Sequence, residues 1–120
     1  MKKIIVVDGE EYVKASSVKQ AAESVDGMPY VVVRTYSAGV FAGYLKSRSG
    51  KEVALVNARR LWYWKGAASL SQLAMEGVSC PDSCKFPCAV IAITLTEAVE
   101  IIEATQEARQ SIEKVKIWKA

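Results

Sequence analysis

The hydrophobic residues fall into short runs separated by turn-forming residues, a pattern typical of β-strands. A valine-rich run predicts a strand at 30–36, and residues 40–47 and 52–56 predict two more across short turns. The aromatic run at 61–64 predicts a fourth, short strand. Strands this close together along the chain indicate an antiparallel meander.

Two further segments carry the spacing and the capping residues of helices. Ser69 at the N-cap and Gln72 three residues later form a capping box, and the helix that they start ends near Gly77. Thr105 is the N-cap residue of a second predicted helix over 106–114. We therefore predict an α+β fold, an antiparallel β-sheet core with a short middle helix and a C-terminal helix.

The beginning of the chain differs in pattern from the rest. An Asp-Gly pair at 8–9, between two strand-like runs, is a strong hairpin signal. Residues 14–29 are polar and alanine-rich, their apolar spacing suits a short helix, and glycine and proline near the end mark a boundary. We predict an N-terminal β-hairpin extension and linker over 1–29 and the main domain over 30–120.

Residues 90–102 form a long β-like segment whose two halves each alternate between apolar and polar positions. Its acidic residues, Glu97, Glu100 and Glu103, predict an exposed or bent edge of the sheet. Residues 115–118 predict a closing strand or a docking tail.

The chain has 120 residues, 51% of them apolar, and no histidine. The missing histidine excludes a Ser-His-Asp or Cys-His nucleophile, an imidazole base and histidine-ligated zinc. Between residues 30 and 75 Glu52 is the only carboxylate, so a paired acid and base would have to come from the flanks. We predict a binding protein and not an enzyme, with no catalytic residue and no cofactor.

The net charge of +3 hides an uneven distribution. Residues 30–75 carry seven bases and one acid, a net charge of +6, and seven of the ten aromatic residues. Arginine forks bind phosphate oxygens and aromatic faces stack on bases, so this composition suits a phosphate-bearing ligand. The alternative is that the aromatics are core and the charges lie on a solvated strand face.

Three cysteines, Cys80, Cys84 and Cys88, are spaced C-x3-C-x3-C. We favour a compact loop with buried or exposed thiols over a three-thiolate metal site completed by Asp82, and predict no metal. The four apolar residues that follow the first lysines are too few for a secretory signal, and no apolar run approaches the about 18 residues of a membrane span. We expect a cytosolic protein that does not enter a membrane.

Arg59 and Arg60 are the best phosphate candidates, because neighbouring strand residues point to opposite faces and one of them should reach the ligand. Trp62 and Trp64 share one face of their predicted strand and Tyr63 takes the other, and at least one face is expected to be core. The candidate ligand-binding residues are Arg34, Ser37, Ala38, Gly39, Arg59, Arg60, Trp62, Trp64, Phe86, Thr94, Thr96 and Arg109.

Several of these candidates have a structural alternative. Arg34 can contact phosphate or simply point outward from its strand, and residues 37–39 can form an anion nest or a plain hairpin turn. Phe86 can stack on a base or pin its loop to the core, and Arg109 can be a surface residue of an exposed helix.

Four stretches occur in a distinctive order: YVVVRTYSAGVFAGYLK at 30–46, NARRLWYWKGAASLSQLA at 57–74, CKFP at 84–87 and IIEATQEARQSIEKVKIW at 101–118. This order resembles the small phage proteins that include the type-one Thoeris anti-defence family. The resemblance implies a sponge in the host cytoplasm. Such proteins bind cyclic ADP-ribose signals of bacterial defence enzymes, and in some members cyclic oligonucleotides, without cleaving them. It also implies an antiparallel β core and assembly into dimers and hexamers.

A short chain has little interior for such a ligand. Nanomolar affinity requires about −12 kcal/mol, so the ligand has to be deeply enclosed, and a pocket shared between the chains of a homo-oligomer is the economical solution. Two other classes remain open: a small nucleic-acid-binding module, and a phage structural or adaptor protein whose N-terminal hairpin adds to a partner's sheet.

Overall fold

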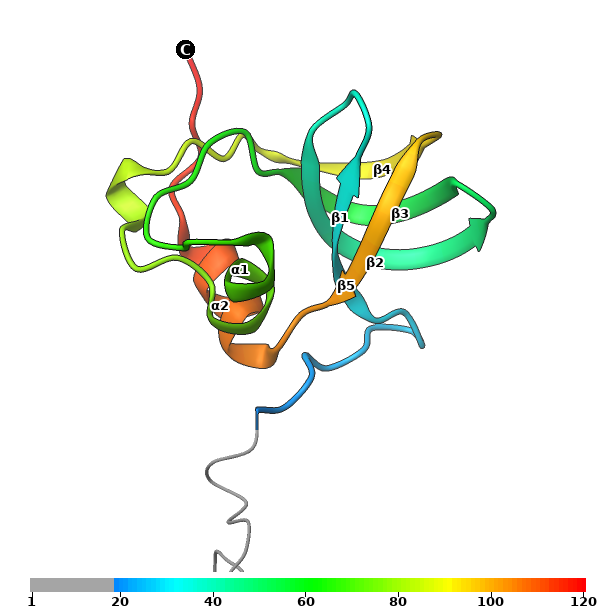
Figure 1. Cartoon of the computed structure of the whole chain (residues 1–120), viewed down its shortest axis with the longest axis horizontal. Helices are drawn as coiled ribbons and strands as arrows, with labels where there is room; N and C mark the ends of the chain where they lie inside the picture. Colours follow the sequence, from blue (N-terminus) through cyan, green and yellow to red (C-terminus); the bar gives the residue numbers. More distant parts are fainter. Residues whose placement is uncertain (1–18) are drawn as a thin grey trace, which may run out of the picture.

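The computed structural model describes residues 19–120 and has an α+β fold, in which a five-stranded antiparallel sheet packs against two helices (Figure 1). The strand order is β4-β3-β2-β1-β5, and every neighbouring pair is antiparallel. The elements are β1 (Tyr30–Thr35), β2 (Val40–Ser49), β3 (Glu52–Arg60), α1 (Leu70–Glu76), a 3-10 turn at Pro81–Ser83, β4 (Ala89–Leu95), β5 (Ala98–Glu103) and α2 (Gln106–Lys114).

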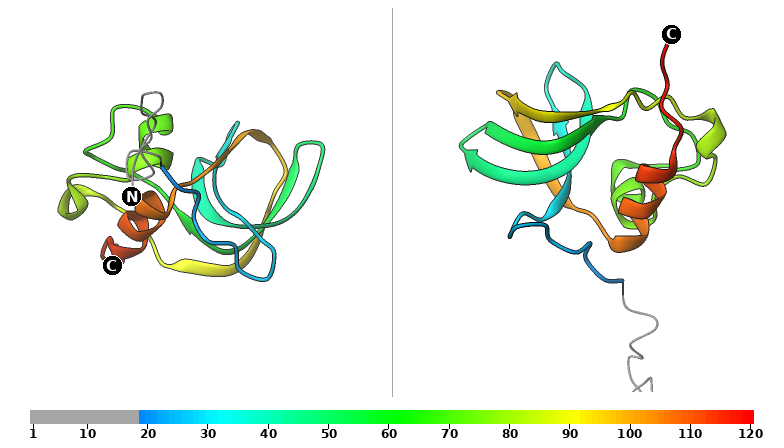
Figure 2. Two further views of the ribbon diagram at one scale, coloured as in Figure 1. Left: turned by 90° about the horizontal axis from the view of Figure 1, so that it is seen from below. Right: turned by 180° about the vertical axis from the view of Figure 1, so that it is seen from behind.

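The sheet is strongly curved because its two edges are joined by a very short connection. β4 and β5 lie at opposite ends of the strand order, yet only residues 96 and 97 separate them. The edges therefore meet at that corner, and the sheet curls into an open barrel (Figure 2). The helices lie to one side of the barrel in both views.

β1 is buried on both faces, which explains its continuous run of apolar residues. Val31 and Val33 pack into one hydrophobic cluster together with residues of β2, β3 and β4. Tyr30 and Val32 point to the opposite face and pack into a second cluster with residues of α1 and α2. Alternation along one strand thus supplies side chains to both cores.

A β-bulge interrupts β3 at Asn57. Ala42 faces Arg59 and Tyr44 faces Val56, so Asn57 and Ala58 together lie opposite Gly43. Asn57 has a φ of 52°, a left-handed conformation that asparagine tolerates better than most residues. A Cβ on Gly43 would lie 2.8 Å from the Ala58 Cα, so the close approach of the strands requires glycine there.

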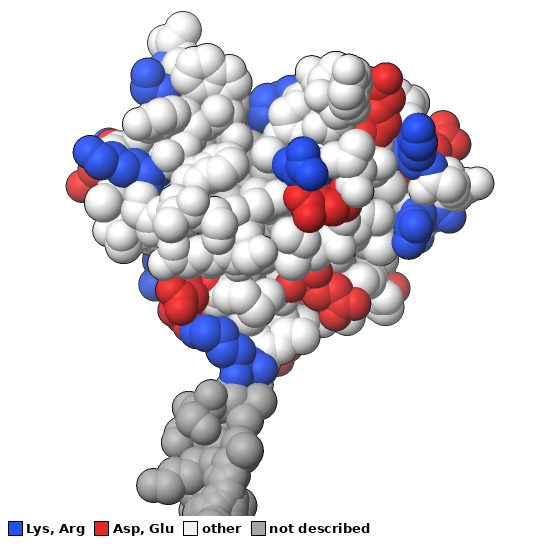
Figure 3. Space-filling view, viewed as in Figure 1, with Lys and Arg blue, Asp and Glu red and all other residues white. Residues whose placement is uncertain are grey.

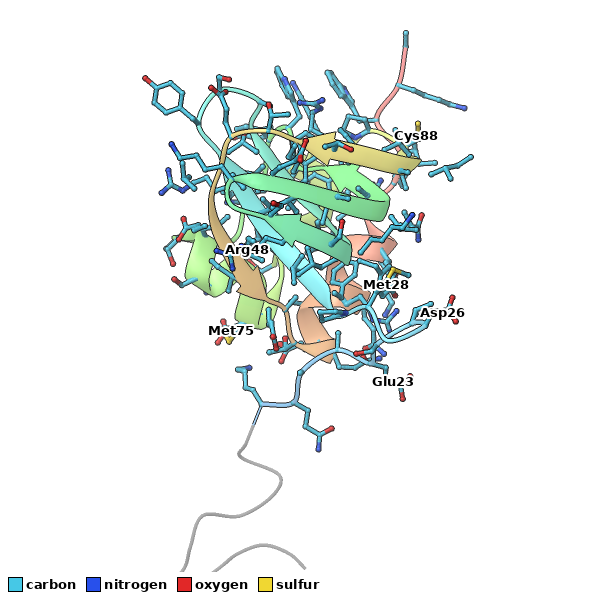
Figure 4. The ribbon with its side chains drawn as sticks, turned by 90° about the vertical axis from the view of Figure 1, so that its right-hand side faces the viewer. Glu23, Asp26, Met28, Arg48, Met75 and Cys88 are labelled. Carbon is cyan, nitrogen blue, oxygen red and sulfur yellow. The ribbon has the colours of Figure 1, made fainter. Side chains whose placement is uncertain are left out.

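Both predicted helix caps are present. The Ser69 hydroxyl accepts a hydrogen bond from the Gln72 amide, and the Thr105 hydroxyl accepts one from the Ala108 amide. The same Thr105 hydroxyl donates to the Met75 carbonyl at 2.6 Å, so one cap also ties the two helices together. Figure 4 shows Met28 and Met75 below the sheet, and both pack against the core cluster on the helix side.

Two expectations about secondary structure are wrong. Residues 61–64 do not form a strand, because β4 takes the place beside β3 and the pairing ends at Arg59 and Ala89. The described part of 14–29, residues 19–29, contains no helix. The expected bent edge at 90–102 is confirmed: the segment bends at residues 96–97, and its two halves are the edge strands β4 and β5.

Residues 19–29 instead run along the start of α2. The Ala22 amide donates to the Ala104 carbonyl, the Gln106 amide donates to the Gln20 carbonyl, and Ala22 is buried in the helix-side core. The predicted hairpin at the start of the chain lies outside the described residues. The boundary at residue 29 stays a prediction.

Among the described residues no helix is both long and apolar enough to cross a membrane. Cys84 is buried, Cys80 is partly buried and Cys88 is exposed just before β4 (Figure 4). Within residues 19–120 there is no cluster of three or more histidine, cysteine or acidic side chains that could hold a metal ion.

Candidate ligand-binding surface

Three irregular segments meet beyond the end of β3 and bring exposed aromatic side chains together. The Tyr63 amide donates to the Lys85 carbonyl at 3.3 Å, and the Lys85 amide donates back at 2.8 Å. The C-terminal tail joins through the Trp118 amide, which donates to the Phe86 carbonyl at 3.0 Å. We call Trp62, Tyr63, Lys85 and Trp118 the aromatic surface. The predicted docking tail at 115–118 is therefore confirmed.

The geometry of the aromatic surface is that of a stacking platform with a cation. The Trp62 and Trp118 rings lie 5.0 Å apart between centroids and only 18° from parallel. The Lys85 ammonium lies 5.6 Å from the Trp62 ring centroid, 5.7 Å from that of Trp118 and 6.0 Å from that of Tyr63. Trp62 is 58% exposed and Trp118 44% exposed, so solvent reaches both rings of the stack. A cavity of about 320 Å³ next to Trp118 is lined by Pro87, Trp118, Lys119 and Ala120.

The two predicted tryptophans do not act as a pair. Trp62 is exposed, whereas Trp64 is partly buried and packs against the helix-side core. The expectation that they share a face depended on a strand at 61–64, and without the strand the two side chains diverge. Trp64 therefore packs against the core, as was expected of one face of this segment, and Trp62 is exposed to solvent.

Arg59 is a buried arginine that holds three segments together. Its Nε donates to the Pro87 carbonyl at 2.8 Å, Nη1 to the Ile112 carbonyl at 2.8 Å and Nη2 to the Phe86 carbonyl at 3.0 Å. The side chain is 7% exposed, and burial lowers its pKa from the ordinary value. Three of its five N–H donors are thus used by the fold.

Arg60 points to the other face of β3, as predicted, and meets the loop at 37–39. Its Nη1 donates to the Ala38 carbonyl at 2.6 Å, and its guanidinium lies 4.4 Å from the Phe41 ring centroid. The loop itself closes through Thr35, whose amide and hydroxyl both donate to the Gly39 carbonyl. The Ala38 amide, a potential nest donor, donates to the Thr35 hydroxyl at 2.9 Å. These contacts favour the plain turn over an anion nest.

The cations of the middle segment are mixed with acids of β5 and its preceding turn. Arg34 Nε donates to Glu100 at 2.6 Å, and the Ser37 hydroxyl donates to Glu97 at 2.5 Å. Figure 3 shows basic and acidic side chains next to one another over the sheet instead of a continuous basic face. On the face that Figure 3 shows, the basic residues are therefore not gathered into one patch.

The remaining candidates lie apart from one another. Phe86 is fully buried and pins its loop to the core, and Thr94 and Thr96 are exposed at the end of β4 and in the turn after it. Arg109 Nη1 pairs with Glu113 on α2 at 3.1 and 3.3 Å. Of the twelve candidates, Trp62 alone belongs to the aromatic surface.

Sequence reasoning missed Tyr63, Lys85 and Trp118 as site residues. Trp118 is 56 positions from Trp62 along the chain, and no local pattern signals that the two rings stack. The one available signal was the tail itself, since a tryptophan in a terminal segment needs something to pack against.

Residues 28–112 match the model of a family described as a domain of unknown function, DUF6948. No curated protein and no solved structure matches the chain.

Proposed function

Since the chain belongs to the DUF6948 family, whose function is unknown, we propose from its own surface that it binds a nucleotide-type molecule and sequesters it without cleaving it. One observation carries the proposal: an exposed Trp62–Trp118 stack with the Lys85 ammonium close to both rings. Indole faces stack on bases of any sequence, and an ammonium group binds phosphate as a point charge.

The ligands that we propose are cyclic ADP-ribose isomers, above all glycocyclic ADP-ribose, and cyclic oligonucleotides. This choice follows the resemblance to the Thoeris anti-defence proteins, in which a phage protein in the host cytoplasm captures an immune signal. A sponge needs affinity and abundance but no catalytic groups.

The proposed pocket is shared between copies of the chain. Cavities of about 190 and 320 Å³ lie at or below the lower end of the range of about 300–1,000 Å³ for pockets that enclose a drug-sized ligand. A ligand in which a pyrophosphate links adenosine to a second ribose therefore needs walls from a second chain. This supports a homo-oligomer, a dimer or a hexamer.

The edge strand β4 is the surface that we propose for the second copy. Its seven residues include no charge and no proline, and Ile91 is 90% exposed. An uncharged edge strand of this kind is a template for pairing with another chain. The other edge, β5, carries Glu100 and Glu103, so pairing with itself would bring like charges together. Antiparallel pairing of β4 with β4 of a second copy closes a two-fold dimer.

Binding and release of intact ligand test the proposed function. Purified protein is titrated with glycocyclic ADP-ribose by calorimetry, and the complex is then heat-denatured and the ligand recovered for mass spectrometry. We expect saturable binding and recovery of unchanged ligand. Failure of every cyclic ADP-ribose isomer and cyclic oligonucleotide to bind would sink the proposal, and recovery of breakdown products would replace it with an enzyme.

A matched pair of variants locates the site. Trp118→Ala removes one ring of the stack, and we expect affinity to fall at least fivefold, because stacking contributes about 1–3 kcal/mol per base. Tyr36→Ala removes an aromatic side chain that is 81% exposed in the β1–β2 loop, and we expect no change. Equal losses in both variants would place the ligand elsewhere.

Single-stranded nucleic acid is the second candidate, favoured by the open and exposed arrangement of the stacked rings. Binding of an oligothymidine that weakens steeply between 50 and 200 mM salt, with no binding of cyclic ligands, would favour this candidate. The mixed charge in Figure 3 favours the smaller ligand.

A further inference from the structure

A second cavity lies across the C-terminal tail from the aromatic surface. It measures about 190 Å³, and its polar wall consists of Tyr30, Asn57, Arg59 and Glu113. Ala89, Val115 and Ile117 complete the lining. Ile117 and Trp118 are adjacent in the tail, with Ile117 on this cavity and Trp118 on the aromatic surface.

The charge of Arg59 has no carboxylate partner among the described residues. The three groups that accept its hydrogen bonds are carbonyls, and none of the ion pairs within residues 19–120 includes it. Buried charges in proteins are normally paired with an opposite charge. The guanidinium keeps two N–H donors beyond those the carbonyls use, and it lies on the wall of a cavity.

The other charged groups around the cavity leave an excess of positive charge. The Glu113 carboxylate on the wall is held by Arg109 Nη1 at 3.1 and 3.3 Å. Two guanidinium groups and one carboxylate give this region a net charge of +1. Tyr30 and Asn57 add a hydroxyl and an amide, groups that donate hydrogen bonds to oxyanions.

The backbone at Asn57 is unusual at the same place. Asparagine adopts a φ of 52° more readily than most residues, and glycine would satisfy the bulge equally well. Asparagine differs from glycine in that it places a side-chain amide on the cavity wall.

We propose that this cavity is a phosphate-binding site in which Arg59 supplies the charge and Asn57 and Tyr30 supply hydrogen bonds to the phosphate oxygens. A volume of about 190 Å³ corresponds to about six water molecules at about 30 Å³ each, so the cavity has room for a phosphate group. The site takes either inorganic phosphate or a phosphate group of a nucleotide. It does not depend on the proposed function of the aromatic surface.

Nuclear magnetic resonance of the ¹⁵N-labelled full chain tests the site. Sodium phosphate is titrated against sodium chloride at constant ionic strength, and the Arg59 Nε–H, the Asn57 side-chain amide and the Ala89 backbone amide are followed. We expect saturable shifts with phosphate and none with chloride. Adenosine monophosphate, titrated separately, distinguishes a nucleotide phosphate from the free ion by whether it binds more tightly.

Two variants preserve the fold while changing the wall. Asn57→Gly keeps the left-handed backbone without the amide, and Tyr30→Phe removes only the hydroxyl. We expect each to weaken phosphate binding at least fivefold, while Tyr36→Ala, at an exposed position in the β1–β2 loop that does not line the cavity, leaves it unchanged. The inference is overturned if phosphate shifts the three signals no more than chloride does, or if both wall variants bind as the original chain does. The indole N–H signals of Trp62 and Trp118 report the aromatic surface separately, so failure of one site is distinguishable from failure of the other.

Discussion

Arg59→Lys is the substitution for which the structure gives the largest expected loss of stability. The guanidinium binds carbonyls of Phe86, Pro87 and Ile112, which belong to the loop before β4 and to α2. A lysine ammonium has three donors on a single atom, so it cannot span three carbonyls that the planar fork reaches from three nitrogens. At least two of the three hydrogen bonds are then lost.

The magnitude follows from these lost bonds. Hydrogen bonds to a charged group contribute about 1.5–3 kcal/mol each, whereas the Phe86 and Ile112 carbonyls still accept from the Trp118 and Val115 amides and add no penalty for an unsatisfied acceptor. We therefore expect the free energy of unfolding to fall by about 3–5 kcal/mol, a large part of the about 5–15 kcal/mol typical of a domain. The loss extends to the aromatic surface, because the Phe86 carbonyl accepts bonds from both Arg59 and the Trp118 amide.

Urea unfolding followed by tryptophan fluorescence measures the effect. With a slope of about 1–3 kcal/mol per molar urea, the midpoint should fall by about 2 M. Arg34→Lys is the control, since Arg34 makes an exposed ion pair with Glu100 and such pairs contribute about 0–1 kcal/mol. A loss below about 1 kcal/mol for Arg59→Lys would refute the reasoning. If Arg59→Lys is too unstable to purify, hydrogen exchange of the Trp118 amide in the more conservative Phe86→Leu variant tests the same junction.

Three further outcomes are expected. Burial, together with the Glu113 carboxylate, raises the pKa of Tyr30 above 10.0, so the folded state holds this proton more tightly and the protein loses stability as pH rises above 10. In Tyr30→Phe the urea midpoint should therefore depend less on pH between pH 9 and 11 than in the original chain. An unchanged pH dependence of the midpoint would contradict the assignment. Gly43→Ala should lower the free energy of unfolding by about 1–3 kcal/mol in the same urea assay, because the alanine Cβ would lie 2.8 Å from the Ala58 Cα. An unchanged free energy of unfolding would show that β2 and β3 can move apart at this position without cost. Ile91→Lys places a charge on the exposed edge strand and should convert an oligomer to a monomer in light scattering, whereas a molar mass equal to that of the original chain would exclude β4 as the interface.

Local patterns predicted the elements that depend on neighbouring residues. The caps at Ser69 and Thr105 act over three residues, so sequence alone located both helices. The first three strands are joined by short turns, and their meander is confirmed. The acids at 100 and 103 correctly indicated a sheet edge, because an unpaired edge tolerates charge, and Glu97 lies in the bend before it.

Predictions that depended on long-range pairing did worse. The run at 61–64 has the composition of a strand, but no strand is available to pair with it once β4 lies beside β3. Arg59 and Arg60 were correctly placed on opposite faces, since that follows from alternation alone. That Arg59 binds three carbonyls could not be predicted, because its partners lie 27 to 53 residues away along the chain.

The sequence by itself determined the fold class, the helix caps and a chemistry without histidine, because these depend on composition and on contacts within a few residues. The tertiary structure alone decided which aromatic rings meet and which cation is buried. Trp62 and Trp118 stack only because the tail docks beside the loop at 84–87, and Arg59 is buried only because α2 and that loop close over β3. A surface made by three distant segments has no signature in any one of them, since each segment contributes only one or two residues to it.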